Sequence, residues 1–216
     1  MLEGNEIHSI PVLDYLLTKS VADNYASSSD QALTGTLTLK VPGATVSEFE
    51  LYQKYHSKYP DLKIEYDTEN MTVIPGYFIN FYNIESLENI SGATPYYSVM
   101  TNGEYTLEVL TSEDGPNAEK LVNPEKASDT FSDYTFSGIW LDADGIRYFT
   151  SLDIGEEYNP EIDILFSEYS PKSELNLRPK WTTITKTYRV EFRDENGDLF
   201  VDEDGNEVAA NNISYG

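Results

Sequence analysis

Residues 77–81 read YFINF, and a similar alternation returns as YRVEF at residues 188–192. In both stretches aromatic or β-branched residues fill the first, third and fifth positions, which is typical of a half-buried β-strand. The two stretches align when Tyr77 is placed on Tyr188, an offset of 188 − 77 = 111 in residue number. The alignment predicts that one module begins near Tyr77 and a second one near Thr187.

Turn signals recur between the two stretches at short intervals, where glycine, proline, asparagine and aspartate cluster. They are Asn102-Gly103, Asp114-Gly115-Pro116, Asp144-Gly145 and Asn159-Pro160. Short strands between closely spaced turns predict one β-rich domain over residues 75–183. Residues 184–216 are then the truncated start of a second repeat, and the whole is expected to be a fragment of a longer polypeptide.

The N-terminal segment, residues 1–74, carries the helical periodicity of the chain. Hydrophobic residues at helical spacing predict a helix over residues 9–20. The stretch TVSE at residues 45–48 has the pattern of a capping box, in which the threonine and the glutamate satisfy free amides at a helix start. It predicts a second helix, which Pro60 ends. Strands are predicted on both sides of this helix, at residues 33–41 and 61–66.

A strand–helix–strand unit this short implies a parallel crossover. The separation of Leu37 and Leu62 in the sequence is 62 − 37 = 25, which falls within the period of leucine-rich repeats, about 20–29 residues. Residues 6–11 would form the preceding strand and turn. Residues 1–74 are therefore predicted to be a short leucine-rich-type α/β cap, with residues 72–76, TVIPG, as a linker.

The composition predicts a folded protein with an acidic surface. The 216 residues are 39% hydrophobic and 13% aromatic, too apolar for a disordered chain. Lysine and arginine number 14 against 38 aspartates and glutamates, a net charge of −24, which argues against nucleic-acid binding and disfavours anionic membranes. The lack of a long apolar run argues against membrane insertion. The absence of cysteine excludes disulfides and thiolate metal sites.

Four motifs in residues 77–198 occur in the order of a known repeat. They are the opening strand YFINF (77–81), YTFSGIW (134–140), DADG (142–145) and LNLRPKW (175–181). In this order they resemble the Listeria–Bacteroides repeat, the internalin B-repeat type. Two departures are the isoleucine that separates Gly138 from Trp140 and the long segment between residues 83 and 124.

The resemblance implies a ubiquitin-like β-grasp fold and a role without catalysis. Such repeats follow leucine-rich arrays in bacterial surface proteins, similar modules occur in bacteriophage virion proteins, and they act as spacers, stalks and adhesive modules. We therefore expect an α+β protein: a leucine-rich-type βαβ cap, a mostly antiparallel β-grasp-like repeat domain, and the start of a second repeat.

The expected function is a non-enzymatic structural or attachment segment of a bacteriophage virion protein, such as a fibre, tail or head decoration. The start MLEGNEIHSI lacks the pattern of a signal peptide, which favours a virion over a bacterial adhesin. The alternatives are an internalin-type adhesin stalk and a carbohydrate-binding module. Expected partners are other virion or surface proteins, further copies of the chain, or a cell-surface glycan or receptor. No cofactor is expected.

Two sets of residues are candidates for binding. Tyr52, Tyr55, Tyr96 and Tyr97 could form an aromatic platform for a sugar or a partner, although a β domain with few aliphatic residues also needs tyrosines in its core. The aspartate-glycine stretches carry oxygen ligands at alternate positions, as calcium loops do. The candidate ligands are Asp194, Asn196, Asp198, Asp202 and Asp204. Glycine at the fourth rather than the sixth position favours ordinary hairpin turns over a calcium loop.

No catalytic residue is predicted. Glu156, Glu157, Glu161 and Asp163 are interpreted as a solvated acidic surface, and the histidines, His8 and His56, fall in separate segments. The structural core is expected to contain Phe81, Phe136, Trp140, Trp181 and Phe192. Residues 187–216 are too few to bury a core of their own, so we expect them to fray or to pack on the preceding domain or a partner.

Overall fold

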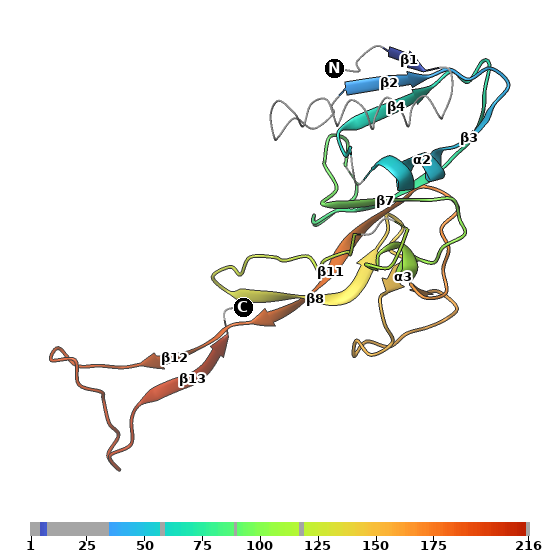
Figure 1. Ribbon diagram of the computed structural model, residues 1–216. Coiled ribbons are helices and arrows are strands. Elements are labelled where there is room, and N and C mark those ends of the chain that lie inside the picture. The colour runs from blue at the N-terminus through green and yellow to red at the C-terminus, as the bar shows by residue number, and fades with distance from the viewer. Residues whose placement is uncertain (1–4, 8–34, 57–58, 89, 117–118, 215–216) are drawn as a thin grey trace.

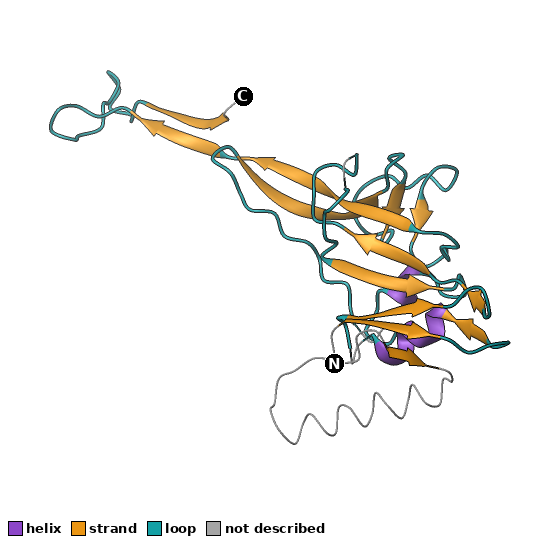
Figure 2. Ribbon diagram, turned by 90° about the horizontal axis from the view of Figure 1, so that it is seen from above, coloured by secondary structure: helices purple, strands orange, loops and turns teal. Residues whose placement is uncertain are grey.

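The computed structural model describes residues 5–7, 35–56, 59–88, 90–116 and 119–214. The fold is mostly β, with a curled mixed sheet and few helical residues. A small parallel assembly, the curled sheet and a two-stranded arm that projects from it follow one another along the chain (Figures 1 and 2). The predicted helix at residues 9–20 and His8 lie outside the described residues. In the described part of the chain, no helix is long and apolar enough to cross a membrane.

The N-terminal part is built from parallel strands. Its three-stranded sheet has the order β1-β2-β4, with β1 at Asn5–Ile7, β2 at Gly35–Leu39 and β4 at Leu62–Tyr66. Beside it, β3 (Thr45–Ser47) pairs in parallel with β5 (Thr72–Ile74), and α2 (Glu48–Tyr55) leads from β3 towards β4. The predicted parallel crossover is confirmed. Residues 72–74 form a strand, so the prediction of a linker over residues 72–76 is wrong there.

The two parallel pairs share one register. Gly35 faces Leu62 and Thr45 faces Thr72, so the separation in sequence is the same in both pairs (62 − 35 = 27 and 72 − 45 = 27). Leu37 faces Ile64 rather than Leu62, which corrects the predicted spacing of 25. The same separation accounts for β5. After the interval that separates β2 from β4, the chain again runs parallel to β3, and residues 72–74 pair with residues 45–47.

Helix α2 starts later than predicted. Thr45 belongs to β3, and the N-cap is Ser47, whose hydroxyl accepts a hydrogen bond from the Glu50 amide at 3.3 Å. Ser47 and Glu50 are themselves at capping-box spacing, so they form a second S-x-x-E pattern that overlaps the first. Strand pairing of residues 45–47 decides between the two. Glu48 then reaches the amide of Gly76 at 2.9 Å instead of its own helix start.

The central sheet has six strands in the order β10-β9-β8-β11-β6-β7. They are β6 (Tyr77–Phe81), β7 (Tyr97–Thr101), β8 (Ser132–Leu141), β9 (Arg147–Phe149), β10 (Ile164–Leu165) and β11 (Leu175–Thr185). In sequence, β6 is the first strand of this sheet and β11 is the last, and the two are parallel neighbours. Three neighbouring pairs, β6–β7, β8–β11 and β8–β9, are antiparallel, whereas β9 and β10 are parallel. The short helix α3 (Leu107–Leu110) contributes two buried leucines.

Two separate groups of buried side chains hold these parts together. The first group contains Leu37, Leu39, Val46, Leu51, Tyr55 and Met71. The second contains Ile79, Phe81, Val99, Leu107, Leu110, Trp140, Tyr148, Phe166 and Leu177. Phe81 and Trp140 are fully buried, as predicted, and their rings meet edge to face at 4.8 Å. Phe136 and Trp181 are half-buried beside them, with ring centroids 6.3 Å apart.

The curl of the sheet coincides with a bulge in β8. Trp140 faces Pro179 and Phe136 faces Trp181. Between these two pairs β8 uses four residue steps (140 − 136 = 4) and β11 only two (181 − 179 = 2), so the extra residues are on β8. Bulges of this kind bend a strand and increase its twist. Gly138 lies inside the bulge at φ +83°, and a Cβ there would come within 2.6 Å of the Ile154 side chain. Glycine at this position is therefore required by both the backbone and the packing.

The C-terminal arm consists of β12 (Thr187–Glu191) and β13 (Ala209–Ser214), which pair antiparallel. Figures 1 and 2 both show it extending away from the central sheet. At its root, the Lys186 amide donates to the Phe131 carbonyl at 2.8 Å and the Tyr188 hydroxyl donates to the Thr130 carbonyl at 2.6 Å. Phe192 is 48% exposed, so its prediction as a core residue is wrong. The strand pattern is present, but no second layer of described residues covers it.

Candidate functional site

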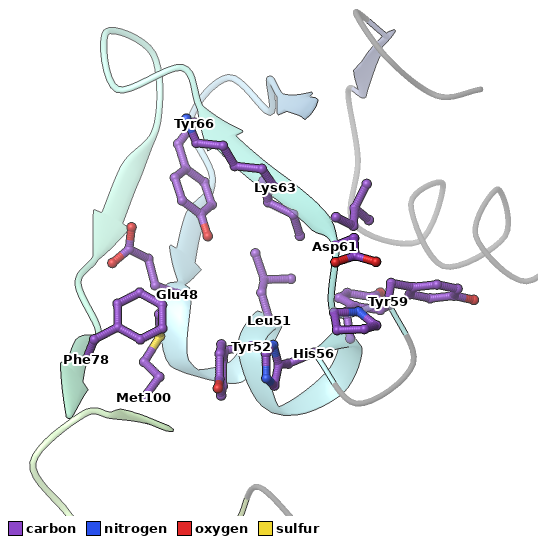
Figure 3. A pocket seen from close by; sticks show the side chains of 14 residues that line it. Glu48, Leu51, Tyr52, His56, Tyr59, Asp61, Lys63, Tyr66, Phe78 and Met100 are labelled. Carbon is purple, nitrogen blue, oxygen red and sulfur yellow. The ribbon is translucent and has the colours of Figure 1, made fainter. Parts of the chain in front are cut away.

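A cavity of about 460 Å³ lies between α2 and β4 and is bordered on one side by β6 and β7 (Figure 3). Its lining combines ring side chains with a few charged ones. The rings are those of Tyr52, Tyr55, His56, Tyr59, Tyr66 and Phe78, and the charged groups are Glu48, Asp61 and Lys63. Concave sites with apolar walls and a small number of polar groups are where small ligands bind. This cavity is therefore the candidate functional site.

Helix geometry places the first wall of the cavity. Tyr52 lies on α2 and His56, one helical turn later, is its C-cap with helical backbone angles, so their side chains lie on the same face. Their rings stack at a centroid distance of 4.2 Å, and the Phe78 ring meets Tyr52 in an edge arrangement at 5.7 Å. The Tyr52 hydroxyl donates to the Ser98 carbonyl at 3.1 Å. This bond fixes the ring orientation and ties α2 to β7.

The electrostatics of the cavity favour neutral rings beside carboxylates. Burial lowers the pKa of His56, so its imidazole is neutral at pH 7. Burial, reinforced by the nearby Glu48 carboxylate, raises the pKa of Tyr66 to about 12, which keeps the phenol protonated. Lys63 lines the cavity, and its ammonium group is paired with the Glu65 carboxylate at 2.8 Å. Glu65 is not one of the lining residues.

The structure brings together only half of the predicted tyrosine platform. Tyr52 and Tyr55 both line the cavity. Tyr96 and Tyr97 are not part of the lining, and their hydroxyls donate to the carbonyls of Val122 at 3.0 Å and Glu119 at 2.7 Å. The Tyr96 ring also stacks on Trp140. These two side chains therefore hold a connecting segment on the core.

Most of the lining was not predicted from the sequence as a binding site, and Glu48, Tyr66 and Phe78 are three examples. A signal for Tyr66 exists, because Leu62, Ile64 and Tyr66 alternate along β4 and share one face of the strand. Phe78 gives no such signal. It occupies the position opposite to the buried Ile79 and Phe81 in the alternation, and only the contact between the two parts of the chain brings it to the cavity.

The candidate cation ligands form tight turns on the arm. The Asp194 carboxylate accepts from the amides of Asn196 and Asp198, both at 2.9 Å. Asp202 does the same with the amides of Asp204 at 3.0 Å and Asn206 at 2.8 Å. These backbone hydrogen bonds lower the pKa of both aspartates. Among the described residues no group of three acidic or histidine side chains is placed to hold a metal ion.

The same turn also occurs in the central sheet. The Asp142 carboxylate accepts from the amides of Asp144 at 3.0 Å and Ile146 at 2.9 Å. In all three turns the glycine that follows the aspartate at the fourth position has a φ between +81° and +88°. This is the geometry of a hairpin turn that ends in a left-handed glycine, and it accounts for the carboxylates of Asp142, Asp194 and Asp202 as acceptors of turn hydrogen bonds.

One carboxylate from the predicted acidic surface is buried instead. Asp163 accepts two hydrogen bonds from the Arg147 guanidinium, at 2.8 Å and 2.6 Å, and a third from the Asn159 amide at 2.7 Å. For Asp163 the prediction of a solvated position is therefore wrong. Burial is possible because both oxygens of the carboxylate are met by donors. Glu156 is paired with Lys180 at the rim of the same loop.

Comparisons of the chain with models of protein families, with curated proteins and with solved structures found no match. The resemblance to the Listeria–Bacteroides repeat therefore depends only on the sequence motifs that carry it.

Proposed function

We propose that the chain is a non-enzymatic, modular segment of a structural or attachment protein, carried on a bacteriophage virion as part of a fibre, tail or head decoration. A stalk of a bacterial surface adhesin is the alternative with the same architecture. One observation carries the proposal: the β12–β13 arm repeats the layout of the β6–β7 hairpin but exposes the face that β6–β7 buries.

The two hairpins match in spacing. Tyr77 on β6 faces Thr101, and Tyr188 on β12 faces Ile213, so the separations in sequence are nearly equal (101 − 77 = 24 and 213 − 188 = 25). Both hairpins are therefore ribbons with a long connection between strands of similar length. The equivalence supports a second copy of the module at the position that the sequence echo predicts.

The two hairpins differ in what covers them. Ile79 and Phe81 on β6 are fully buried in the core of the central sheet. Their equivalents on the arm are not: Val190 is 39% exposed and Phe192 is nearly half exposed. Phe200 and Val201 add further exposed apolar surface on the arm. Contiguous exposed apolar surface marks a place where another protein surface packs. A structural protein made of consecutive modules or subunits supplies such a cover.

The strand arrangements support the finer assignments. A β-grasp sheet places its first and last strands side by side and parallel, each flanked by an antiparallel partner, and β6 and β11 are arranged in this way. The separation between partners in the N-terminal parallel strands falls within the leucine-rich range. We include both in the proposal: a leucine-rich-type cap followed by β-grasp-like repeats.

Immunogold labelling of particles and cells from the source tests the proposed role. Antibodies against the chain should label the outside of purified virions. A Val190→Asp and Phe192→Asp double variant should be lost from the particles, because charge on the apolar face prevents packing of its cover. The control is a Leu152→Asp and Ile162→Asp double variant, which puts the same two charges at exposed sites off the arm and should be retained.

The labelling pattern decides between the alternatives. Label on the bacterial envelope in place of virions would move the proposal to the adhesin stalk. Label confined to the cytosol, or equal retention of the arm variant and its control, would contradict the proposal.

A further inference from the structure

The cavity between α2 and β4 has an aromatic cage at one end. Figure 3 shows Tyr66 reaching into the space from β4, with Leu51 beneath it and the Phe78 ring and Glu48 to one side. Tyr52 completes the wall next to Phe78, to which its ring stands at 82°. Rings inclined to one another around a common space present both faces and edges to whatever occupies it.

The charge of the lining selects the kind of occupant. Among the described lining residues, the carboxylates are those of Glu48 and Asp61, and the ammonium group is that of Lys63, which is paired with Glu65. One Glu48 oxygen accepts from the Gly76 amide at 2.9 Å, which holds the carboxylate beside the rings. The cavity belongs to a chain with a net charge of −24. The negative electrostatic potential of these carboxylates and of the whole chain concentrates cations near the cavity and repels anions.

We propose that this cavity binds an organic cation bearing an alkylated ammonium group of the choline type. The faces of tyrosine and phenylalanine rings attract such cations, and the methyl groups fill apolar space that a hydrated metal ion would leave unused. The Glu48 carboxylate supplies the counter-charge. The inference goes beyond the proposed structural role and stands independently of the arm.

The position of the cavity gives binding a structural consequence. Glu48, Tyr52 and Tyr66 come from the N-terminal part, whereas Phe78 and Met100 come from the central sheet. A ligand held among them contacts both parts at once. It should therefore stabilise the junction between the two groups of buried residues as well as occupy a site.

Titration of the full chain with choline chloride, followed by NMR shifts of amide and aromatic protons, tests the proposal against equal additions of sodium chloride. The neutral compound 3,3-dimethylbutan-1-ol has the shape of choline without its charge. Cation–π attraction and the Glu48 carboxylate together predict that choline binds about fivefold more tightly than this neutral compound. Tetramethylammonium should shift the same resonances.

Two variants, Phe78→Leu and Glu48→Gln, test where choline binds, and Phe200→Leu is the control for the first. Phe78→Leu should weaken choline binding about fivefold through loss of a ring face. The same change at Phe200, which is 52% exposed against 42% for Phe78, should leave binding unchanged because Phe200 lies on the arm. Glu48→Gln keeps an acceptor for Gly76 while removing the charge, and it should weaken choline but not its neutral isostere.

The outcomes that overturn the proposal are distinct. Equal affinity for choline and the neutral isostere would show a merely apolar cavity. Saturable binding of methyl glucoside without binding of choline would assign the cavity to sugars. The absence of a saturable shift with either cation would also overturn the proposal. The comparison on the unmodified chain decides even if a variant fails to fold.

Discussion

Trp140 is the centre of an aromatic group in the central sheet. Its indole is fully buried and meets Phe81 edge to face, Phe136 at 5.1 Å and Tyr96 at 6.2 Å. Its Nε1–H is buried and has no hydrogen-bond partner among the described residues. The residue therefore stabilises the fold through contact area and ring geometry, and its polar atom detracts from that contribution.

Replacement of Trp140 should separate these two contributions. Trp140→Ala should lower the free energy of unfolding by about 3–5 kcal/mol, as for other large buried side chains. Trp140→Phe should cost clearly less, because it keeps an aromatic ring and removes a donor that has nothing to bind. Urea denaturation followed by circular dichroism measures both. Equal losses for the two variants would show that the indole nitrogen has a partner.

At the scale of single residues, an alternating pattern agrees with burial only where another layer of described residues covers the strand. Phe81 and Phe192 occupy the same position in two similar strands, yet one is fully buried and the other is half exposed. The alternating pattern identifies a face that can be buried. Whether it is buried depends on residues distant in sequence, such as Trp140 and Leu177 over Phe81.

The ion pair of Arg147 and Asp163 fixes the loop that connects β9 to β10. Arg147 on β9 donates to the Asp163 carboxylate just before β10, and it also donates to the Glu157 carbonyl at 3.2 Å. Burial alone would raise the pKa of Asp163. The hydrogen bonds from Arg147 and Asn159 outweigh burial and hold this pKa below its usual value.

The lowered pKa of Asp163 predicts a dependence of stability on pH. A group whose pKa falls on folding stabilises the protein above its unfolded pKa, about 3.9 for aspartate, and loses this effect as pH falls through the folded pKa. Asp163→Asn should cost about 1.5–3 kcal/mol at neutral pH, as for hydrogen bonds to charged groups. It should also weaken the loss of stability below about pH 4.

Chemical denaturation at several pH values checks this prediction. The control is Glu156→Gln, because the Glu156 side chain lies at the rim of the same loop and is far more exposed than that of Asp163. The control should retain nearly all of the stability at neutral pH. An acid-induced loss that is identical in Asp163→Asn and the unmodified chain would place the pH dependence in other carboxylates.

At the scale of elements, local patterns predicted β6 and the parallel pairing of β2 with β4, but not the register of that pairing or the start of α2. The overlap of TVSE and SEFE at residues 45–50 left two possible helix starts, and pairing of β3 with β5 selects the second. The predicted period of 25 followed from two leucines, Leu37 and Leu62, that do not face each other. Register depends on which strands meet, and short strands with similar residues allow several alignments.

At the scale of the whole molecule, two groups of buried residues meet through a small junction. The groups share no residue. Across the junction, Tyr52 bonds to Ser98, Glu48 accepts from Gly76, and the rings of Phe49 and Tyr105 lie 5.8 Å apart. Such a junction is much smaller than either core, so each part should be able to lose structure separately.

Hydrogen exchange in Trp140→Ala tests this independence. Amides of β6 and β11 should lose protection, because their core contains Trp140, whereas amides of β2 should keep most of theirs. The unmodified chain under the same conditions is the reference. Parallel loss of protection in β2 and β6 would show that the two parts unfold as one unit.

The parallel pairing of β6 with β11 has a mechanical consequence for the proposed structural role. The polypeptide enters the central sheet at the start of β6 and leaves it at the end of β11, towards the arm. Opposite pulls on these two ends would slide the strands along each other, so the hydrogen bonds between Leu175–Leu177 and Ile79–Phe81 would bear the load together rather than one after another. Tension along the chain thus meets the sheet in its most resistant direction, whereas the β12–β13 pair, pulled at both ends, would unzip.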